Sequence, residues 1–282
     1  MNLPEKADLP FFAYGIFKPG QLAFFQIREL VKKTLANCVI SGTLLERDGL
    51  PIIDKDGSAK VKGTLIFFKE GRNLEAYERI VGIEPDKHYR WGVTKAEHSE
   101  YNGETNVLFG RKPGRGSVPF EEQEWDARKD PLFTSALEVV RETLEQNKEL
   151  EWNLKPLFRL QMAYLLLWSA IERYVSLRYH LGEKVSEKVK HLAEEKPFKE
   201  SLKIFVKEKR DVFKAAEPED KITLDPSNPN NSLNYYYQIR SNITHRGKSV
   251  VMDFDKLLKS LEELYNIFKI VLNEAFKEAH IF

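Results

Sequence analysis

FFAYGIFKPG, residues 11–20, is the stretch from which the fold prediction starts. An apolar β-type run leads into a turn with glycines at 15 and 20, and a stretch of helical character follows near residues 21–36. Glycine permits positive φ and lets a ligand approach the backbone closely. A strand, a glycine-rich turn and a helix leave backbone N–H groups at a helix N-terminus, which suits a carboxylate or a phosphate. An ordinary strand-to-helix turn explains the same residues, so both interpretations stay open.

More short β-type runs follow this turn up to about residue 110, separated by Gly, Asp, Asn and Pro. They are NCVISGTLL from residue 37, AKVKGTLIFF from 59, YRWGVTKAE from 89 and TNVLFG from 105. A second helical stretch is expected near 73–81. From about residue 130 the apolar residues recur at helical spacing, beginning with Phe133, Leu137, Val140 and Leu144. We therefore predict an α+β chain: a small mixed β-barrel/α domain over 1–120, a linker over 121–130, and an all-α bundle over 131–282.

Composition excludes several classes of protein. The 282 residues carry 44 Lys+Arg against 43 Asp+Glu, which argues against a general nucleic-acid coat or an anionic-membrane binder. The single Cys38 excludes a disulfide framework and Cys-based metal sites. The first ten residues, MNLPEKADLP, do not resemble a secretory signal, and the most apolar stretch, 160–175, contains charged residues. We expect a cytoplasmic protein with no membrane contact, no metal and no cofactor.

Glu84 is the first candidate catalytic residue. It lies between Ile83 and Pro85 at the expected end of the 73–81 helix. A carboxyl group in apolar surroundings tends to have a raised pKa and can act as a general acid or base near neutral pH. A surface glutamate paired with Lys87 or Arg90 is the alternative, and the sequence does not separate the two.

Together these residues resemble the gamma-glutamylcyclotransferase-like family over roughly residues 10–115. The similarity is carried by the YGxFxxG turn, the stretch from Gly49 to Asp54, and the IEPxxxYxW segment. It implies a small ligand, such as a gamma-glutamyl or amino-acid-derived compound, bound through its carboxylate by the turn, with residues Tyr14, Gly15, Ile16, Phe17 and Gly20 as candidates. It also implies that Glu84 is the acid/base that cyclises a gamma-glutamyl group to 5-oxoproline.

The second candidate site is RSNITHRG, residues 240–247. Gly247 is a natural helix stop, so His245 would lie in a last helical turn, where the helix dipole favours the imidazolium. Either His245 simply complements that dipole and Arg240 bridges to an acid such as Glu172, or the two residues are catalytic. An imidazole with an ordinary pKa of about 6.5 can move a proton, and a guanidinium can bind a phosphate.

This Arg-x4-His motif in a helical half resembles the HEPN family over about residues 130–282. The resemblance implies a metal-independent endoribonuclease, toxin-like or defence-like, that works as a homodimer on an RNA substrate. In that reading His245 transfers the proton of a ribose 2′-OH, Arg240 binds the scissile phosphate, and Asn242 orients the histidine or binds a phosphate oxygen. RNA cleavage by the helical half in a homodimer is the leading hypothesis, with the N-terminal domain recognising a small ligand or amino-acid adduct and tuning the cleavage. The cyclotransferase with a merely dimerising helical half is the alternative, and a non-catalytic interaction module is the third.

Overall fold

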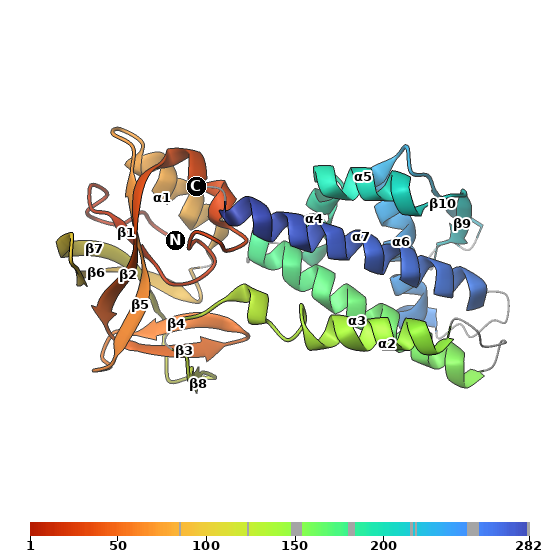
Figure 1. Cartoon of the computed structure of the whole chain (residues 1–282), viewed down its shortest axis with the longest axis horizontal. Coiled ribbons are helices and arrows are strands. Elements are labelled where there is room, and N and C mark those ends of the chain that lie inside the picture. The colour runs from red at the N-terminus through yellow and green to blue at the C-terminus, as the bar shows by residue number, and fades with distance from the viewer. Residues whose placement is uncertain are drawn as a thin grey trace. The chain divides into compact units, whose positions relative to one another are not determined.

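The computed structural model describes residues 1–84, 86–122, 124–147, 154–179, 184–214, 217, 219–246 and 254–280, without the side chains of residues 185, 186, 245, 246 and 280. The chain divides into two compact units. The first consists of residues 1–130 with 177–183 and 276–282, and the second of residues 131–176 and 184–275. The first unit contains the β-barrel and the second is largely helical (Figure 1). The predicted α+β organisation is confirmed at this level.

Five strands of the first unit close into a mixed barrel in the order β1–β5–β2–β6–β7 (Figure 1). Neighbours are antiparallel except at the seam between β1 and β7, where Phe11 pairs with Asn106 in parallel. The barrel strands are β1 (Phe11–Ala13), β2 (Val31–Ser41), β5 (Lys60–Phe68), β6 (Tyr89–His98) and β7 (Tyr101–Gly110). A second sheet has the order β4–β3–β8 and consists of β3 (Thr43–Arg47), β4 (Leu50–Asp54) and β8 (Val118–Pro119).

The barrel forms because its strands carry bulky apolar side chains on the inward face. In β2, Leu35, Cys38 and Ile40 are buried, and the residues between them are partly or fully exposed. β-Branched and aromatic residues pack well on such a pleated surface. One contiguous core results, formed by Phe12, Tyr14, Leu35, Cys38, Ile40, Leu44, Ile53, Val61, Leu65, Ala96, Val107 and Phe109.

The two helices predicted in this half have different outcomes. The helix near 73–81 is confirmed as α1 (Asn73–Ile83), which buries Ala76, Tyr77, Ile80 and Ile83 at helical spacing. The helix near 21–36 is wrong. Two short 3₁₀ turns, Phe24–Gln26 and Arg28–Leu30, are followed at Val31 by β2, whose pairing with β5 overrides the helical spacing of these residues.

The second unit is built on long helices. Aromatic side chains of α3 (Leu154–Arg178) pack against two other helices. The ring centroids of Trp168 and of Tyr237 on α6 (Pro229–Arg246) lie 5.4 Å apart, and those of Tyr174 and of Phe268 on α7 (Phe254–His280) lie 5.7 Å apart. The expectation of an all-α half is wrong in one respect, because β9 and β10 form a two-stranded antiparallel sheet that contacts α6. The elements are α2 (Ser135–Asn147), α3 (Leu154–Arg178), α4 (Val185–Leu192), α5 (Lys196–Phe205), β9 (Arg210–Phe213), β10 (Lys221–Leu224), α6 (Pro229–Arg246) and α7 (Phe254–His280).

Candidate active site

The turn from Tyr14 to Gly20 leaves the end of β1 and is held by its own backbone. The N–H of Lys18 donates to the carbonyl of Gly15 at 3.0 Å, and the N–H of Ala23 donates to the carbonyl of Ile16 at 3.1 Å. Within the described part of the chain, the N–H groups of Gly15, Ile16 and Phe17 donate to no acceptor. Three successive donors in one turn are a chemical match for an oxyanion such as a carboxylate.

This arrangement corrects the expected helix N-terminus. No α-helix begins at the turn, so the donors belong to the turn itself. Gly20 is not among the residues of the cavity described below. Its φ of +87° favours glycine, and its N–H donates at 2.8 Å to the carbonyl of Ala279, within the same unit.

Glu84 is positioned by the end of α1. Its N–H still donates to the carbonyl of Ile80 at 2.9 Å, but its ψ of 124° is extended. A following proline disfavours the helical region for the preceding residue, and the sequence has Pro85 at that place. The helix therefore ends at Ile83, and Glu84 follows it as a buried residue of the first unit.

The carboxyl group of Glu84 is buried, and no described residue is an ionic partner to it. The residue is 8% exposed, and in the part of the chain that the structure describes its Oε2 atom has no hydrogen-bond partner. Burial raises the pKa of Glu84 to about 8. The alternative of a surface ion pair with Lys87 or Arg90 is absent from the described residues.

Glu84 and the turn line the same small cavity, which is partly open to solvent. Apart from the carboxyl group and two tyrosines, its side chains are apolar. The lining residues are Phe11, Ala13, Tyr14, Gly15, Ile16, Phe17, Leu50, Pro51, Glu84, Tyr89 and Leu108. The cavity is thus lined both by the turn with its three unused backbone N–H groups and by a buried carboxyl group.

Two tyrosines fix its walls. The hydroxyl of Tyr14 donates to the carbonyl of Leu108, and that of Tyr89 donates to the carbonyl of Pro51 at 3.1 Å. Burial, and to a lesser degree the neighbouring carboxyl of Glu84, raise the pKa of Tyr14. Tyr14 therefore stays protonated and serves as a hydrogen-bond donor to the backbone.

Sequence reasoning missed Tyr89, Leu50 and Pro51 as lining residues. Gly49 has a φ of +72°, and the turn that it completes sends Leu50 and Pro51 toward the Tyr14–Gly20 turn. The approach is so close that a Cβ atom on Gly15 would lie 3.0 Å from Cγ of Pro51. The signal available in the sequence was the Asp48–Gly49 pair, which marks a tight turn but does not reveal what it faces.

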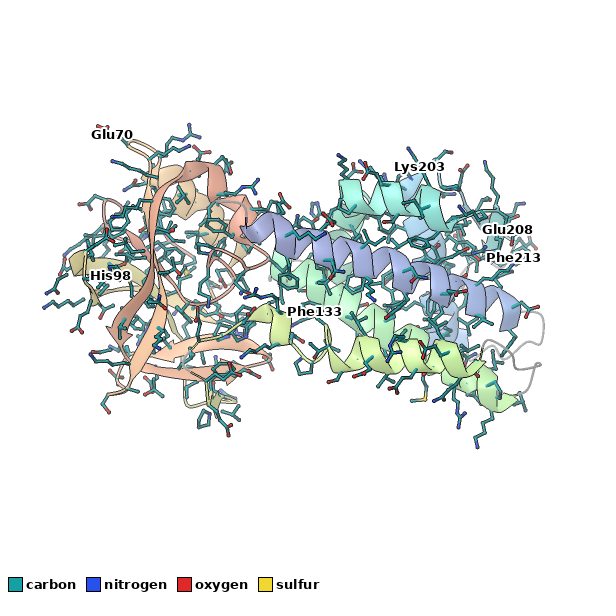
Figure 2. All side chains as sticks on the ribbon, viewed as in Figure 1. Glu70, His98, Phe133, Lys203, Glu208 and Phe213 are labelled. Atoms are coloured by element: carbon teal, nitrogen blue, oxygen red, sulfur yellow. The ribbon has the colours of Figure 1, made fainter. Side chains whose placement is uncertain are left out.

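The second candidate site lies on α6. Nη2 of Arg240 is 3.2 Å from Oε1 of Glu172, and the guanidinium lies 5.7 Å from the ring centre of Tyr237. The amide of Asn242 is engaged at both ends, because its oxygen accepts from Gln238 at 3.0 Å and its nitrogen donates to the carbonyl of Phe213 at 3.0 Å. The ring of Phe213 itself is half exposed (Figure 2).

The backbone of His245 belongs to α6, but its side chain lies outside the described residues. The structure therefore brings Arg240 to Glu172, which is the ion pair expected if Arg240 is not catalytic. The distance from Arg240 to the imidazole of His245 lies outside the described residues.

Two general properties of the described residues bear on cofactors and membranes. No group of three or more His, Cys, Asp or Glu side chains among them could hold a metal ion. None of the helices in the same ranges has the length and apolar character needed to cross a membrane. In comparisons with known proteins, the chain matches no family model, no curated protein and no solved structure.

Proposed function

We propose that the first unit is an acid–base enzyme for a small amino-acid-derived substrate, with Glu84 as the proton-transferring group. The observation that carries this proposal is a buried carboxyl group, with Oε2 unpartnered among the described residues, in a cavity that is also lined by the three turn residues whose backbone N–H groups are unused. A carboxyl with a pKa of about 8 is largely protonated at pH 7 yet able to release its proton, which suits general acid–base catalysis.

The substrate class that fits is a gamma-glutamyl compound, in keeping with the resemblance to gamma-glutamylcyclotransferases. The α-carboxylate would accept hydrogen bonds from the N–H groups of Gly15, Ile16 and Phe17. The α-amine nitrogen then attacks the side-chain amide carbon. Glu84 in its ionised form takes the proton that the amine loses and returns it to the departing amine, as the old C–N bond breaks. The products are 5-oxoproline and a free amine, and Glu84 ends in its starting state.

The test uses the purified full chain with a panel of gamma-glutamyl dipeptides, and 5-oxoproline is measured by mass spectrometry. We expect turnover by the wild type and a loss of at least about 100-fold in Glu84→Gln, because the amide cannot exchange the proton. Glu78→Gln is the matched control, since Glu78 is an exposed glutamate on the same helix. Equal turnover in Glu84→Gln and the wild type would refute the assignment.

Metal-independent RNA cleavage by a homodimer remains our prediction for the second unit, and it rests on the RSNITHRG motif. The contact between Arg240 and Glu172 is compatible with it, because a guanidinium has five N–H donors and this contact joins one nitrogen to the carboxylate. The geometry supports the cavity of Glu84 more strongly.

A further inference from the structure

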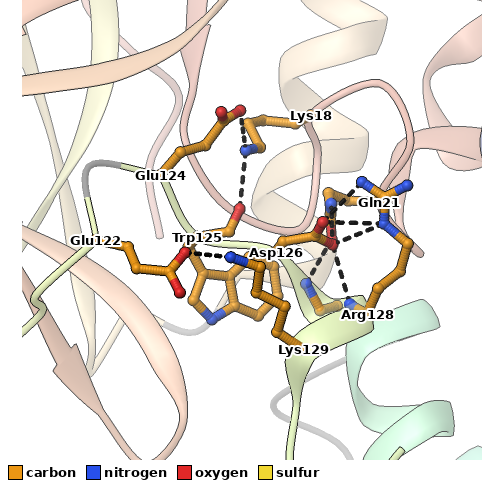
Figure 3. A network of polar contacts seen from close by, with 9 residues as sticks. Lys18, Gln21, Glu122, Glu124, Trp125, Asp126, Arg128 and Lys129 are labelled. Carbon is orange, nitrogen blue, oxygen red and sulfur yellow. Dashed lines mark hydrogen bonds and ion pairs between the residues drawn. The ribbon is translucent and has the colours of Figure 1, made fainter. Parts of the chain in front are cut away.

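Residues 124–129 contact the Tyr14–Gly20 turn through the side chain of Lys18. The ammonium group of Lys18 donates to Oε1 of Glu124 at 2.6 Å and to the carbonyl of Trp125 at 2.8 Å (Figure 3). Only 4% of Lys18 is exposed. Burial lowers the pKa of Lys18, and the carboxylate of Glu124 partly offsets this effect. A buried ammonium group is costly unless paired, so these two contacts strongly favour one position of the turn.

Gln21, just after the turn, makes a second connection to the same segment. Its amide nitrogen donates to Oδ1 of Asp126 at 3.0 Å, and its amide oxygen accepts from the N–H of Ala127 at 2.9 Å (Figure 3). Asp126 is itself held by Arg128, whose guanidinium donates to both carboxylate oxygens. Burial opposes ionisation of Asp126, but the hydrogen bonds from Arg128 and Gln21 outweigh it and lower its pKa to about 2.

Trp125 connects the segment to the opposite wall of the cavity. Its ring is 4% exposed, and Nε1 donates to the carbonyl of Gly49 at 3.2 Å. The two residues after Gly49, Leu50 and Pro51, line the cavity opposite Gly15. One short segment therefore holds the turn through Lys18 and Gln21, and the β3–β4 hairpin through Trp125.

We propose that residues 124–129 are the positioning element of the cavity, and that Lys18 and Trp125 set the separation between the turn and the Leu50–Pro51 wall. The inference rests on the proposed function of the cavity and adds positioning residues that do not touch the substrate. Because the two walls meet at Gly15 and Pro51, a loss of either connection lets them separate and admits water to Glu84. Tyr14 and Tyr89 are the other titratable side chains among the described lining residues, and both donate to backbone carbonyls.

The experiment compares Lys18→Met and Trp125→Phe with two controls in the full chain. Lys129→Met removes an exposed lysine of the same segment, and Trp168→Phe alters a buried indole in the second unit. The titration midpoint of the Glu84 carboxyl is followed by ¹³C NMR, with Glu84→Gln to assign the signal. We expect it to fall by about one pH unit in Lys18→Met and Trp125→Phe, as water lowers the desolvation of the carboxyl, and to stay in place in both controls.

The second readout is the kinetics with the dipeptides, where we expect KM to rise about 10-fold with a smaller change in kcat, since the donors of the turn are displaced while Glu84 remains. Circular dichroism confirms that each variant is folded, and Trp125→Phe, which keeps an aromatic ring but removes the Nε1 donor, covers the case in which Lys18→Met does not fold. A Glu84 midpoint unchanged by both variants overturns the positioning role and leaves the proposed function intact. A shifted midpoint in a protein that turns over no dipeptide supports the positioning role and refutes the proposed function.

Discussion

The hydroxyl of Tyr14 donates to the main-chain carbonyl of Leu108, although the carboxyl group of Glu84 lines the same cavity with Oε2 unpartnered in the described structure. The hydroxyl of Tyr14 thus holds the cavity wall, whereas Oε2 of Glu84 has no hydrogen-bond partner among the described residues. A buried acid that is not neutralised by a protein cation or hydrogen bond keeps a proton at neutral pH. The first two predictions rest on this difference between Tyr14, which supports the cavity wall, and Glu84, whose carboxyl group is not used in such a contact.

Glu84→Gln should change how stability depends on pH. The pKa of Glu84 is about 8 in the folded protein, against an ordinary value of 4.5. Between these values the folded state keeps a proton that the unfolded state has released, so the free energy of unfolding falls as pH rises from about 4.5 to about 8 and then levels off. The total change is roughly 5 kcal/mol. Urea denaturation between pH 5 and pH 9 should show this fall in the wild type and in Glu78→Gln, but not in Glu84→Gln. A slope that persists in Glu84→Gln contradicts the assignment.

Tyr14→Phe should destabilise the first unit by about 1–3 kcal/mol, because the buried carbonyl of Leu108 loses its donor. Tyr101→Phe is the matched control. Its hydroxyl also donates to a backbone carbonyl, that of Glu104, but at an exposed position where water replaces the donor. Chemical denaturation measured with a probe of the barrel checks the difference, and equal losses in the two variants would show that the Tyr14 contact has no special weight.

Gly15→Ala should weaken substrate binding in the cavity and should hardly change the stability of the helices. The new methyl group would lie 3.0 Å from Cγ of Pro51, so one wall must shift by a few tenths of an ångström. We expect KM for gamma-glutamyl dipeptides to rise about 10-fold, since a small displacement of an anion-binding turn weakens its hydrogen bonds. Gly82→Ala is the control, because its Cβ meets nothing within 4 Å on α1 and should raise stability by about 0.5 kcal/mol. Unchanged kinetics in Gly15→Ala would place substrate elsewhere.

The ribonuclease prediction for the second unit is tested with labelled single-stranded RNA in the presence of EDTA. We expect the wild type to leave 2′,3′-cyclic phosphate ends, and His245→Ala and Arg240→Ala to lose at least about 100-fold in rate. Arg141→Ala is the matched control, since Arg141 is likewise an arginine paired with glutamates on a helix of this unit. Cleavage by His245→Ala at the wild-type rate, or cleavage of an all-deoxy strand, would exclude the mechanism.

Short-range signals account for what the sequence predicted correctly. The β-type runs and the apolar face of α1 were visible because side-chain periodicity is local, and Glu84 stood out because Pro85 follows it. The stretch 21–36 misled because its helical spacing competes with the β2–β5 pairing, a long-range interaction. The resemblance grouped Gly49–Asp54 with the turn, but local signals do not show that Leu50, Pro51 and Trp125 come close to it. Their approach depends on the folded hairpin and on the hydrogen bond from Trp125 to Gly49.

The β1–β7 seam has a consequence for the order in which the unit folds. β1 has three residues and pairs with β7 through Phe11 and Asn106, so the barrel closes only after β7, which ends at Gly110, has been synthesised. Joining such distant residues is entropically slow. Leu108 of β7 lines the cavity and burial raises the pKa of Glu84, so we expect a nascent chain that lacks β7 to leave this carboxyl in water with a pKa near its ordinary value of 4.5. At neutral pH, closure of the seam therefore takes up about one proton from solvent, and Glu84 becomes a protonated, neutral acid only once the barrel is complete.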